Sequence, residues 1–173
     1  MRGLFKRFEK GFKRKVDDVR RATATPSRTP PSRAPDPSAT PRGARKLAHP
    51  TKKNDRGLRR ENESADALSR HGYDVEQSPK PRWNGKEPDY KIEGRYFDSY
   101  APDTKDIDNL RDEISKKVRD KKTGFLQADR IVLDMRDSPH SLTDVLAVLG
   151  RKPIRGLREV IVIEDGIPRQ LFP

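Results

Sequence analysis

Two aspartates, Asp89 and Asp98, lie on either side of a predicted turn at residues 93–94. The flanking stretches 88–92 and 95–100 are predicted to be the two strands of a hairpin. In a hairpin centred on that turn the two aspartates lie directly opposite each other, with Cβ atoms roughly 5 Å apart. Carboxylates at that distance destabilise the hairpin unless they share a proton or hold a cation. The pair is therefore a candidate half of a site for Mg²⁺, which accepts one or two carboxylates plus waters and phosphate oxygens.

The alternative is a hairpin whose open end frays, so that water solvates both aspartates. The same centring pairs Tyr90 with Phe97, which makes the register testable. The sequence offers no other catalytic pattern, because its histidines are scattered and it has neither a P-loop nor a G-x-G-x-x-G motif. It contains no cysteine, which excludes disulfides and thiolate metal sites.

The elements that must position this hairpin follow from hydrophobic periodicity. Apolar residues at spacings of three and four indicate helices, and short apolar runs indicate buried strands. The expected helices are 58–71, 106–121 and 142–149, and the expected strands are 73–77, 88–92, 95–100, 130–133 and 159–164. The order αβββαβαβ predicts an α/β protein with three layers, α/β/α, around a central mixed sheet.

Two of these helices carry further charged candidates. In the second helix, Lys117 lies on the flank of the apolar face, whereas Lys116 points nearly opposite. Lys117 either reaches over the sheet toward the aspartates or extends into water. In the first helix, Glu61 shares a face with apolar residues, which is unusual for an unpaired carboxylate. Glu63 lies on the other side and is the weaker candidate, but both glutamates stay open because a real helix can be rotated from the ideal.

Charge is distributed unevenly along the 173 residues, of which 38% are charged and 31% hydrophobic. Residues 1–56 hold 17 Lys/Arg and 5 Asp/Glu, whereas residues 57–173 hold 22 of each kind. The whole formal net charge of +12 therefore belongs to the first third of the chain. Such a basic arm indicates an electrostatic partner, either nucleic acid or an anionic surface, or else a solvating tail.

The sequence predicts three parts. Residues 1–21 form a basic amphipathic helix, residues 22–56 form a linker rich in Pro and Arg, and residues 57–173 form the folded domain. The first two parts are expected to be largely disordered, with the linker extended and not packed. The helix is expected to contact nucleic acid, a membrane surface or a partner, or to pack on its own domain. No transmembrane segment and no secretory signal peptide is recognised, so the localisation in the producing cell stays open.

Several stretches resemble a known family. In order along the chain they are RRENESADALSRHGYDVEQSP, PDYKIEGRYFDSYAP, ISKKV, QADRIVLDM and GLREVIVIEDG. Together they resemble the C-terminal tRNA nuclease domain of contact-dependent growth inhibition (CdiA) toxins, over residues 57–173. That family is similar in fold to the PD-(D/E)xK nucleases, whose core order αβββαβ agrees with the predicted elements.

The resemblance implies roles for the hairpin residues. Asp89, after Pro88, matches the PD aspartate, and Asp98 matches the acidic residue of the second motif. The standard pattern has a lysine two residues after that acid, but here the position is Tyr100. A lysine displaced onto the following helix would replace it.

Lys117 is the chosen lysine, with Lys116 and Lys121 behind it. A glutamate of the first helix, Glu61 or Glu63, completes the set.

The function implied by the resemblance is a metal-dependent endonuclease toxin that cleaves tRNA. Asp89, Asp98 and Glu61 would hold a divalent ion, expected to be Mg²⁺, and Lys117 would orient a water or stabilise the transition state. A cognate immunity protein is an expected partner, and the toxin would act in the cytoplasm, as in a target cell after delivery. The alternatives are a DNA endonuclease on the same scaffold and a catalytically inactive nucleic-acid-binding or interaction protein. Tyr100 favours the inactive protein, whereas the acidic set argues against a mere binder of polyanions.

A basic loop before Asp89 adds candidates for binding nucleic acid. Basic side chains can contact phosphates, and the one tryptophan can stack on a base or else tuck into the core. The candidates are Lys80, Arg82, Trp83 and Lys86 of this loop, together with Lys91 of the strand that follows.

Overall fold

The structure is a computed structural model that describes residues 27–120 and 122–173. The helix expected within residues 1–21 and the candidate Lys121 lie outside the described residues. In the described part of the chain, no helix is long and apolar enough to cross a membrane. The elements are β1 (Arg42–Gly43), the 3-10 turn η1 (Lys53–Asp55), α2 (Arg56–Arg70), β2 (Val75–Gln77), β3 (Tyr90–Ile92), β4 (Arg95–Tyr100), α3 (Ile107–Val118), β5 (Arg130–Asp134), α4 (Leu142–Arg151), β6 (Glu159–Glu164) and β7 (Ile167–Phe172).

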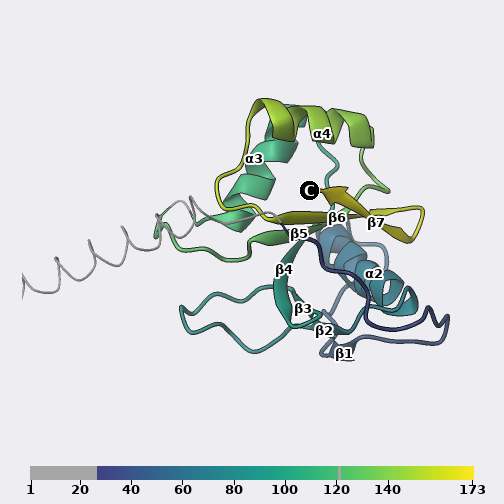
Figure 1. The fold of residues 1–173 in the computed structure, drawn as a ribbon. Coiled ribbons are helices and arrows are strands. Elements are labelled where there is room, and N and C mark those ends of the chain that lie inside the picture. Colours follow the sequence, from purple (N-terminus) through teal and green to yellow (C-terminus); the bar gives the residue numbers. More distant parts are fainter. Residues whose placement is uncertain (1–26, 121) are drawn as a thin grey trace, which may run out of the picture.

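The strands form one seven-stranded mixed sheet in the order β1 to β7. β4, β5 and β6 are parallel neighbours, while β3 is antiparallel to both β2 and β4, and β7 is antiparallel to β6. α3 connects β4 to β5 and α4 connects β5 to β6. Because crossovers between parallel strands are almost always right-handed, two crossovers in the same direction place both helices on one face. Figure 1 shows α3 and α4 on one side of the sheet and α2 on the other. The predicted α/β class and mixed sheet are therefore confirmed.

Strands β1 and β7 are additions to the predicted order. β1 has only two residues, too few for a periodic pattern. β7 contains Pro168 and is mostly half-exposed, as befits an edge strand, and this weakens its sequence signal. Both strands are therefore evident only from their pairing in the structure, β1 with β2 and β7 with β6.

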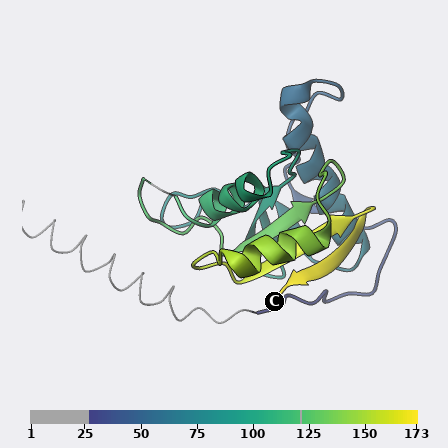
Figure 2. The same cartoon turned by 90° about the horizontal axis from the view of Figure 1, so that it is seen from above.

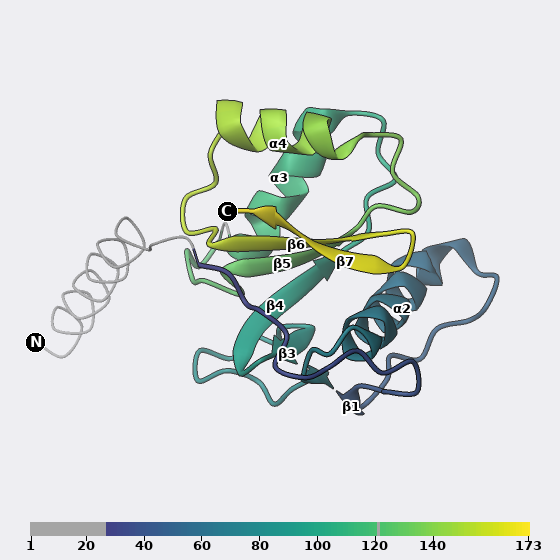
Figure 3. The ribbon, with the colours of Figure 1, turned by 45° about the vertical axis from the view of Figure 1, so that its right-hand side comes forward.

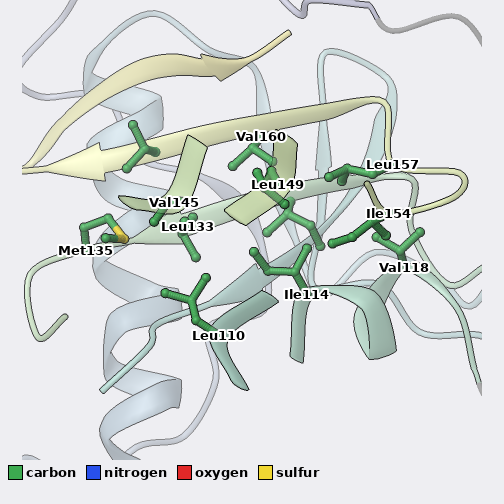
Figure 4. Close-up of a cluster of buried hydrophobic side chains, with 12 residues drawn as sticks. Leu110, Ile114, Val118, Leu133, Met135, Val145, Leu149, Ile154, Leu157 and Val160 are labelled. Carbon is green, nitrogen blue, oxygen red and sulfur yellow. The ribbon is translucent and has the colours of Figure 1, made fainter. Parts of the chain in front are cut away.

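Two apolar clusters hold the sheet between its helices. Strand β6 shows why, because Val160 and Val162 face one side while Ile161 and Ile163 face the other. The first side packs against α3 and α4, which lie next to each other when seen from above (Figure 2). Figure 4 shows this cluster, in which Ile114 and Val118 of α3 lie among residues of α4 and the sheet. The second cluster belongs to α2 and includes Leu68.

Helix α3 has a defined start and ends earlier than expected. The Asp106 side chain caps it by accepting hydrogen bonds from the backbone N–H groups of Asp108 (2.8 Å) and Asn109 (3.3 Å). The helix ends at Val118 because Arg119 is extended and forms an antiparallel bridge with Leu126. Lys117 therefore lies in the last turn of the helix.

The segment 27–46, here called the strap, corrects the expectation of an unpacked linker. Figure 3 shows it in purple, passing beside β4 and β3 toward β1. The Thr29 side chain and backbone N–H both donate 2.6 Å hydrogen bonds to the carboxylate of Glu159, which is fully buried at the start of β6. Farther on, the Arg33 N–H donates to Gly72 O. Prolines keep this segment extended, so its remaining N–H groups are not used in a helix of its own. They are available to bind buried acceptors of the domain.

Candidate functional site

The hairpin that carries the two aspartates has the predicted register. Tyr90 pairs with Phe97, and the turn residues Glu93 and Gly94 have φ values of +49° and +75°, as a type I′ turn requires. Asp89 comes directly before β3 and therefore lies opposite Asp98. The sequence prediction of the hairpin is confirmed.

Both aspartates are fixed by hydrogen bonds. The backbone N–H of Asp89 donates to Asp98 Oδ1 (3.3 Å), and the backbone N–H of Ser99 donates to Asp89 Oδ2 (2.8 Å). Gln127 Nε2, from the loop before β5, donates to Asp98 Oδ2. Asp98 is fully buried. The alternative of a frayed hairpin with two solvated aspartates is therefore excluded.

Charged groups from two helices and the strap surround the carboxylates of this site. The pKa of Asp98 is raised to about 7, first by burial and then by the neighbouring charge of Asp89, while Lys117 opposes both effects. Burial likewise raises the pKa of Glu61 to about 7, again with a contribution from Asp89 and with opposition from Lys46 and Lys117. The five side chains thus form one electrostatic cluster, and at neutral pH Asp98 and Glu61 each hold a proton part of the time.

Helix α2 brings Glu61 to the site. Its side chain accepts a hydrogen bond of 3.4 Å from Gln77 Nε2, and its oxygen lies 3.9 Å from Lys46 Nζ. The Tyr90 hydroxyl donates to the backbone carbonyl of Glu61 (2.6 Å), which fixes this turn of the helix on the sheet. Glu63 is not brought to the aspartates, because residues two apart in a helix project roughly 200° apart. It pairs instead with Arg60 (2.7 Å) and Arg136 (2.8 Å).

Helix α3 separates the two described lysine candidates in the same way. Lys117 is half-buried and its charge acts on both Asp98 and Glu61. Lys116 is exposed and pairs with Glu113 one turn earlier. The structure therefore brings only Lys117 of this pair to the carboxylates.

A metal ion would find two carboxylates here, not a larger group. No group of three or more His, Asp and Glu able to hold a metal exists among residues 27–120 and 122–173. The metal-site prediction therefore depends on Asp89 and Asp98, whose oxygens are hard ligands and whose mutual repulsion a cation would relieve. Two carboxylates are enough for Mg²⁺ when phosphate oxygens and waters complete the shell. Glu61 contributes charge to the site, but the geometry does not favour it as a third ligand.

The basic loop lies beside the carboxylates and is anchored to the loop before β5. Arg82 donates to Gln127 O (2.8 Å), and its guanidinium lies 5.0 Å from the ring centre of Tyr96. Lys86 pairs with Asp120, so its charge and that of Arg82 are partly engaged within the domain.

The remaining candidates of this group are directed outward. Trp83 has 81% of its surface exposed, which excludes the alternative of a core tryptophan. Lys80 is exposed, and Lys91 Nζ lies 5.9 Å from the ring centre of Tyr96.

Three residues of the site were not predicted from the sequence. Gln127 comes from a loop without periodicity, Gln77 ends a short strand, and Lys46 lies in the proline-rich segment. Only the folded chain places them at the carboxylates. A polar residue at the end of an apolar strand is the one weak indication, and it applies to Gln77.

The fold and the site define an α/β protein in which a half-buried aspartate and a fully buried one lie opposite each other, next to a lysine and a basic loop. The sequence profile of the contact-dependent growth inhibition CdiA C-terminal domain matches residues 86–167. A solved chain of the CdiA-CT/CdiI toxin and immunity complex from Burkholderia pseudomallei is similar, with a TM-score of 0.66 and 38% identity. The match covers 78% of this chain and 99% of that one. The chain therefore belongs to the family of CdiA C-terminal domains.

A curated relative extends this comparison. The tRNA nuclease CdiA-2 of Burkholderia pseudomallei (strain 1026b) is 44% identical over 109 residues, which are 63% of this chain. The chain spans only 3% of the length of that protein. The range matched by the profile, residues 86–167, contains three of the site residues, Asp89, Asp98 and Lys117.

Proposed function

We propose that this chain is a tRNA endonuclease that acts as a growth-inhibition toxin in the cytoplasm of a target cell. The observation that carries the proposal is the convergence of Asp89, Asp98, Glu61 and Lys117, from three separate elements, in a member of this family. A relative with 44% identity is named a tRNA nuclease, which supports tRNA as the substrate. The proposed reaction is hydrolysis of one phosphodiester bond.

The proposed site has a PD-(D/E)xK-like arrangement. Pro88-Asp89 supplies the first acid and Asp98 the second. Tyr100 does not replace the missing lysine, because burial raises its pKa to about 12 and it stays neutral. Lys117, entering from α3, supplies the cation in its place.

A divalent ion, proposed to be Mg²⁺, would be held by Asp89 and Asp98 and would supply Lewis-acid stabilisation of the phosphate charge. Gln127 and the backbone N–H groups of Asp89 and Ser99 orient the two carboxylates toward this role. Lys117 Nζ stabilises the negative charge that develops on the phosphate oxygens. Glu61, with a pKa of about 7, is suited to accept a proton from the attacking water at its carboxylate oxygen.

The basic loop is proposed to hold the RNA. Exposed Trp83 offers a ring on which an unpaired base can stack, and Lys80 and Lys91 can contact phosphates. Arg82 and Lys86 mainly fix the loop, because both have partners within the domain.

A cognate immunity protein is a proposed partner. The similar solved chain comes from a complex of toxin and immunity protein, which supports this assignment. Such a partner would protect the cell that makes the toxin.

The test incubates the full chain, produced in a protected host, with total bacterial RNA and separately with plasmid DNA, in Mg²⁺ or in EDTA. Discrete tRNA fragments are expected in Mg²⁺, and they should disappear in EDTA and with Asp98→Ala. Lys117→Met should slow cleavage about 100-fold or more, as does loss of other transition-state donors.

Lys116→Met is the matched control for Lys117→Met, because the neighbouring lysine points away from the site. It should leave cleavage unchanged. Cutting of DNA alone would change the substrate to that of the alternative DNA endonuclease. Intact nucleic acid under every condition, from folded protein, would refute the enzyme and favour the inactive binding protein.

A further inference from the structure

Residues 42–46 of the strap are built into the domain next to the candidate site. β1 pairs in parallel with β2, with Gly43 opposite Gln77. Gly43 has a φ of +84°, and a Cβ there would lie 2.0 Å from Gln77 O, so the close approach requires glycine. The Ser78 hydroxyl donates to Ala44 O (2.9 Å) and extends this contact.

The backbone of Lys46 is then fixed by the side chain of Asn62 in α2. The N–H of Lys46 donates to Asn62 Oδ1 (3.0 Å), and Asn62 Nδ2 donates to the carbonyl of Lys46 (2.9 Å). Asn62 is itself buried, and its Oδ1 also accepts from Gln77 Nε2 (2.6 Å). These bonds position Lys46 beside Glu61, the residue that precedes Asn62.

Among the described residues, the ammonium of Lys46 has a long ion pair with Glu61 and donates no hydrogen bond. Its Nζ lies 3.9 Å from Glu61 Oε1, which is longer than a hydrogen bond. The side chain is 35% exposed, whereas that of Glu61 is 7% exposed. The ammonium therefore lies on the solvent side of Glu61, with donors that can bind another anion.

We propose that Lys46 is a substrate-contacting residue of the candidate site, binding a backbone phosphate of the RNA next to the bond that is cut. This inference rests on the proposed nuclease function. Three carboxylates repel a polyanion, and Lys117 offsets only part of their charge. A second cation at the solvent side of the cluster would lower the electrostatic cost of bringing a phosphate there. Lysine suits this role, as a point charge on a flexible stem.

The test measures binding of labelled total bacterial tRNA to the full chain at several NaCl concentrations. All proteins carry Asp98→Ala, and EDTA is present, so that no RNA is cut. Lys46→Met should weaken binding about tenfold, the size of one charge-assisted hydrogen bond. It should also reduce the slope of log affinity against log salt by about 1. Lys46→Arg should restore most of the affinity.

Lys52→Met is the control, since Lys52 is an exposed lysine six residues after Lys46, just beyond the strap. Equal effects of Lys46→Met and Lys52→Met would overturn the inference. So would a loss of affinity with Lys46→Met that Lys46→Arg does not restore and that is accompanied by a lower Tm, because Lys46 would then be structural. A parent protein that neither binds tRNA here nor cuts it with Asp98 intact would refute the nuclease proposal itself.

Discussion

At the residue scale, Asp98 shows burial and a neighbouring carboxylate acting in the same direction. Its side chain is fully buried and Asp89 lies opposite, so both effects raise its pKa, to about 7. Hydrogen bonds from Asp89 N–H and Gln127 oppose the shift without cancelling it. The folded chain therefore holds a proton at Asp98 up to a higher pH than the unfolded chain does.

The first prediction concerns the pH dependence of stability. The pKa of an aspartate in an unfolded chain is roughly 3.9, below the folded value. The stability that Asp98 contributes is thus fully present below that pH and is lost as the pH rises through about 7. Relative to Asp98→Asn, the unmodified chain should lose at most about 1.4 kcal/mol per pH unit between pH 5 and 8. Denaturant unfolding in EDTA measures this difference.

Asp112→Asn is the control, because Asp112 is an exposed carboxylate on α3. Its pH profile should follow that of the unmodified chain. If the free energy of unfolding of the unmodified chain, relative to that of Asp98→Asn, stays constant or rises with pH, a raised pKa at Asp98 is contradicted.

At the element scale, the strap joins parts of the chain that are far apart in sequence. Thr29 contacts the start of β6 through Glu159, and Arg95 of β4 donates to Thr29 Oγ1 (3.0 Å). Arg130 of β5 donates to the same glutamate (3.1 Å). A buried carboxylate is stable only with such donors, so the strap completes the polar interior at this end of the sheet.

The corresponding prediction is that Thr29→Val lowers the free energy of unfolding by about 1–3 kcal/mol, because the buried carboxylate of Glu159 loses a hydroxyl donor. Thr40→Val is the matched control, since Thr40 is an exposed threonine of the strap. Denaturant unfolding of the two variants gives the comparison. Equal stabilities would mean that the strap contributes nothing through this contact.

At the scale of the whole molecule, the excess positive charge and the candidate carboxylates lie in different parts of the sequence. The formal net charge of +12 arises within residues 1–56, whereas the carboxylate pair and Lys117 lie in the balanced remainder. Long-range attraction of RNA and cleavage are therefore expected to depend on different parts of the chain.

Removing residues 1–26 takes away nine Lys/Arg and three Asp/Glu, which lowers the formal net charge from +12 to +6. The shortened chain should bind tRNA more weakly, with a shallower dependence of log affinity on log salt, while keeping cleavage at low salt. A full-length chain in which six of those nine Lys/Arg are changed to Gln also has a net charge of +6, so it separates charge from length and should behave alike. An unchanged salt slope would show that residues 1–26 do not contact phosphates.

Local pattern was enough to predict the hairpin and most of the core. The turn centred on residues 93–94 predicted the register, and helical geometry ranked Glu61 above Glu63 and Lys117 above Lys116. The hairpin register and the helix face of a residue both depend on residues close in sequence, through the turn type and the helical period.

The strap and the supporting residues of the site depended on tertiary structure. A proline-rich segment reads as a linker because nothing local shows the buried acceptors that hold Thr29 and Lys46. Gln127 likewise reaches Asp98 only after β4 and β5 have paired. The sequence by itself thus determined most of the elements, all but β1 and β7, and the central carboxylates. Only the tertiary structure decided which polar residues surround them, because contacts between distant segments leave no periodic signal.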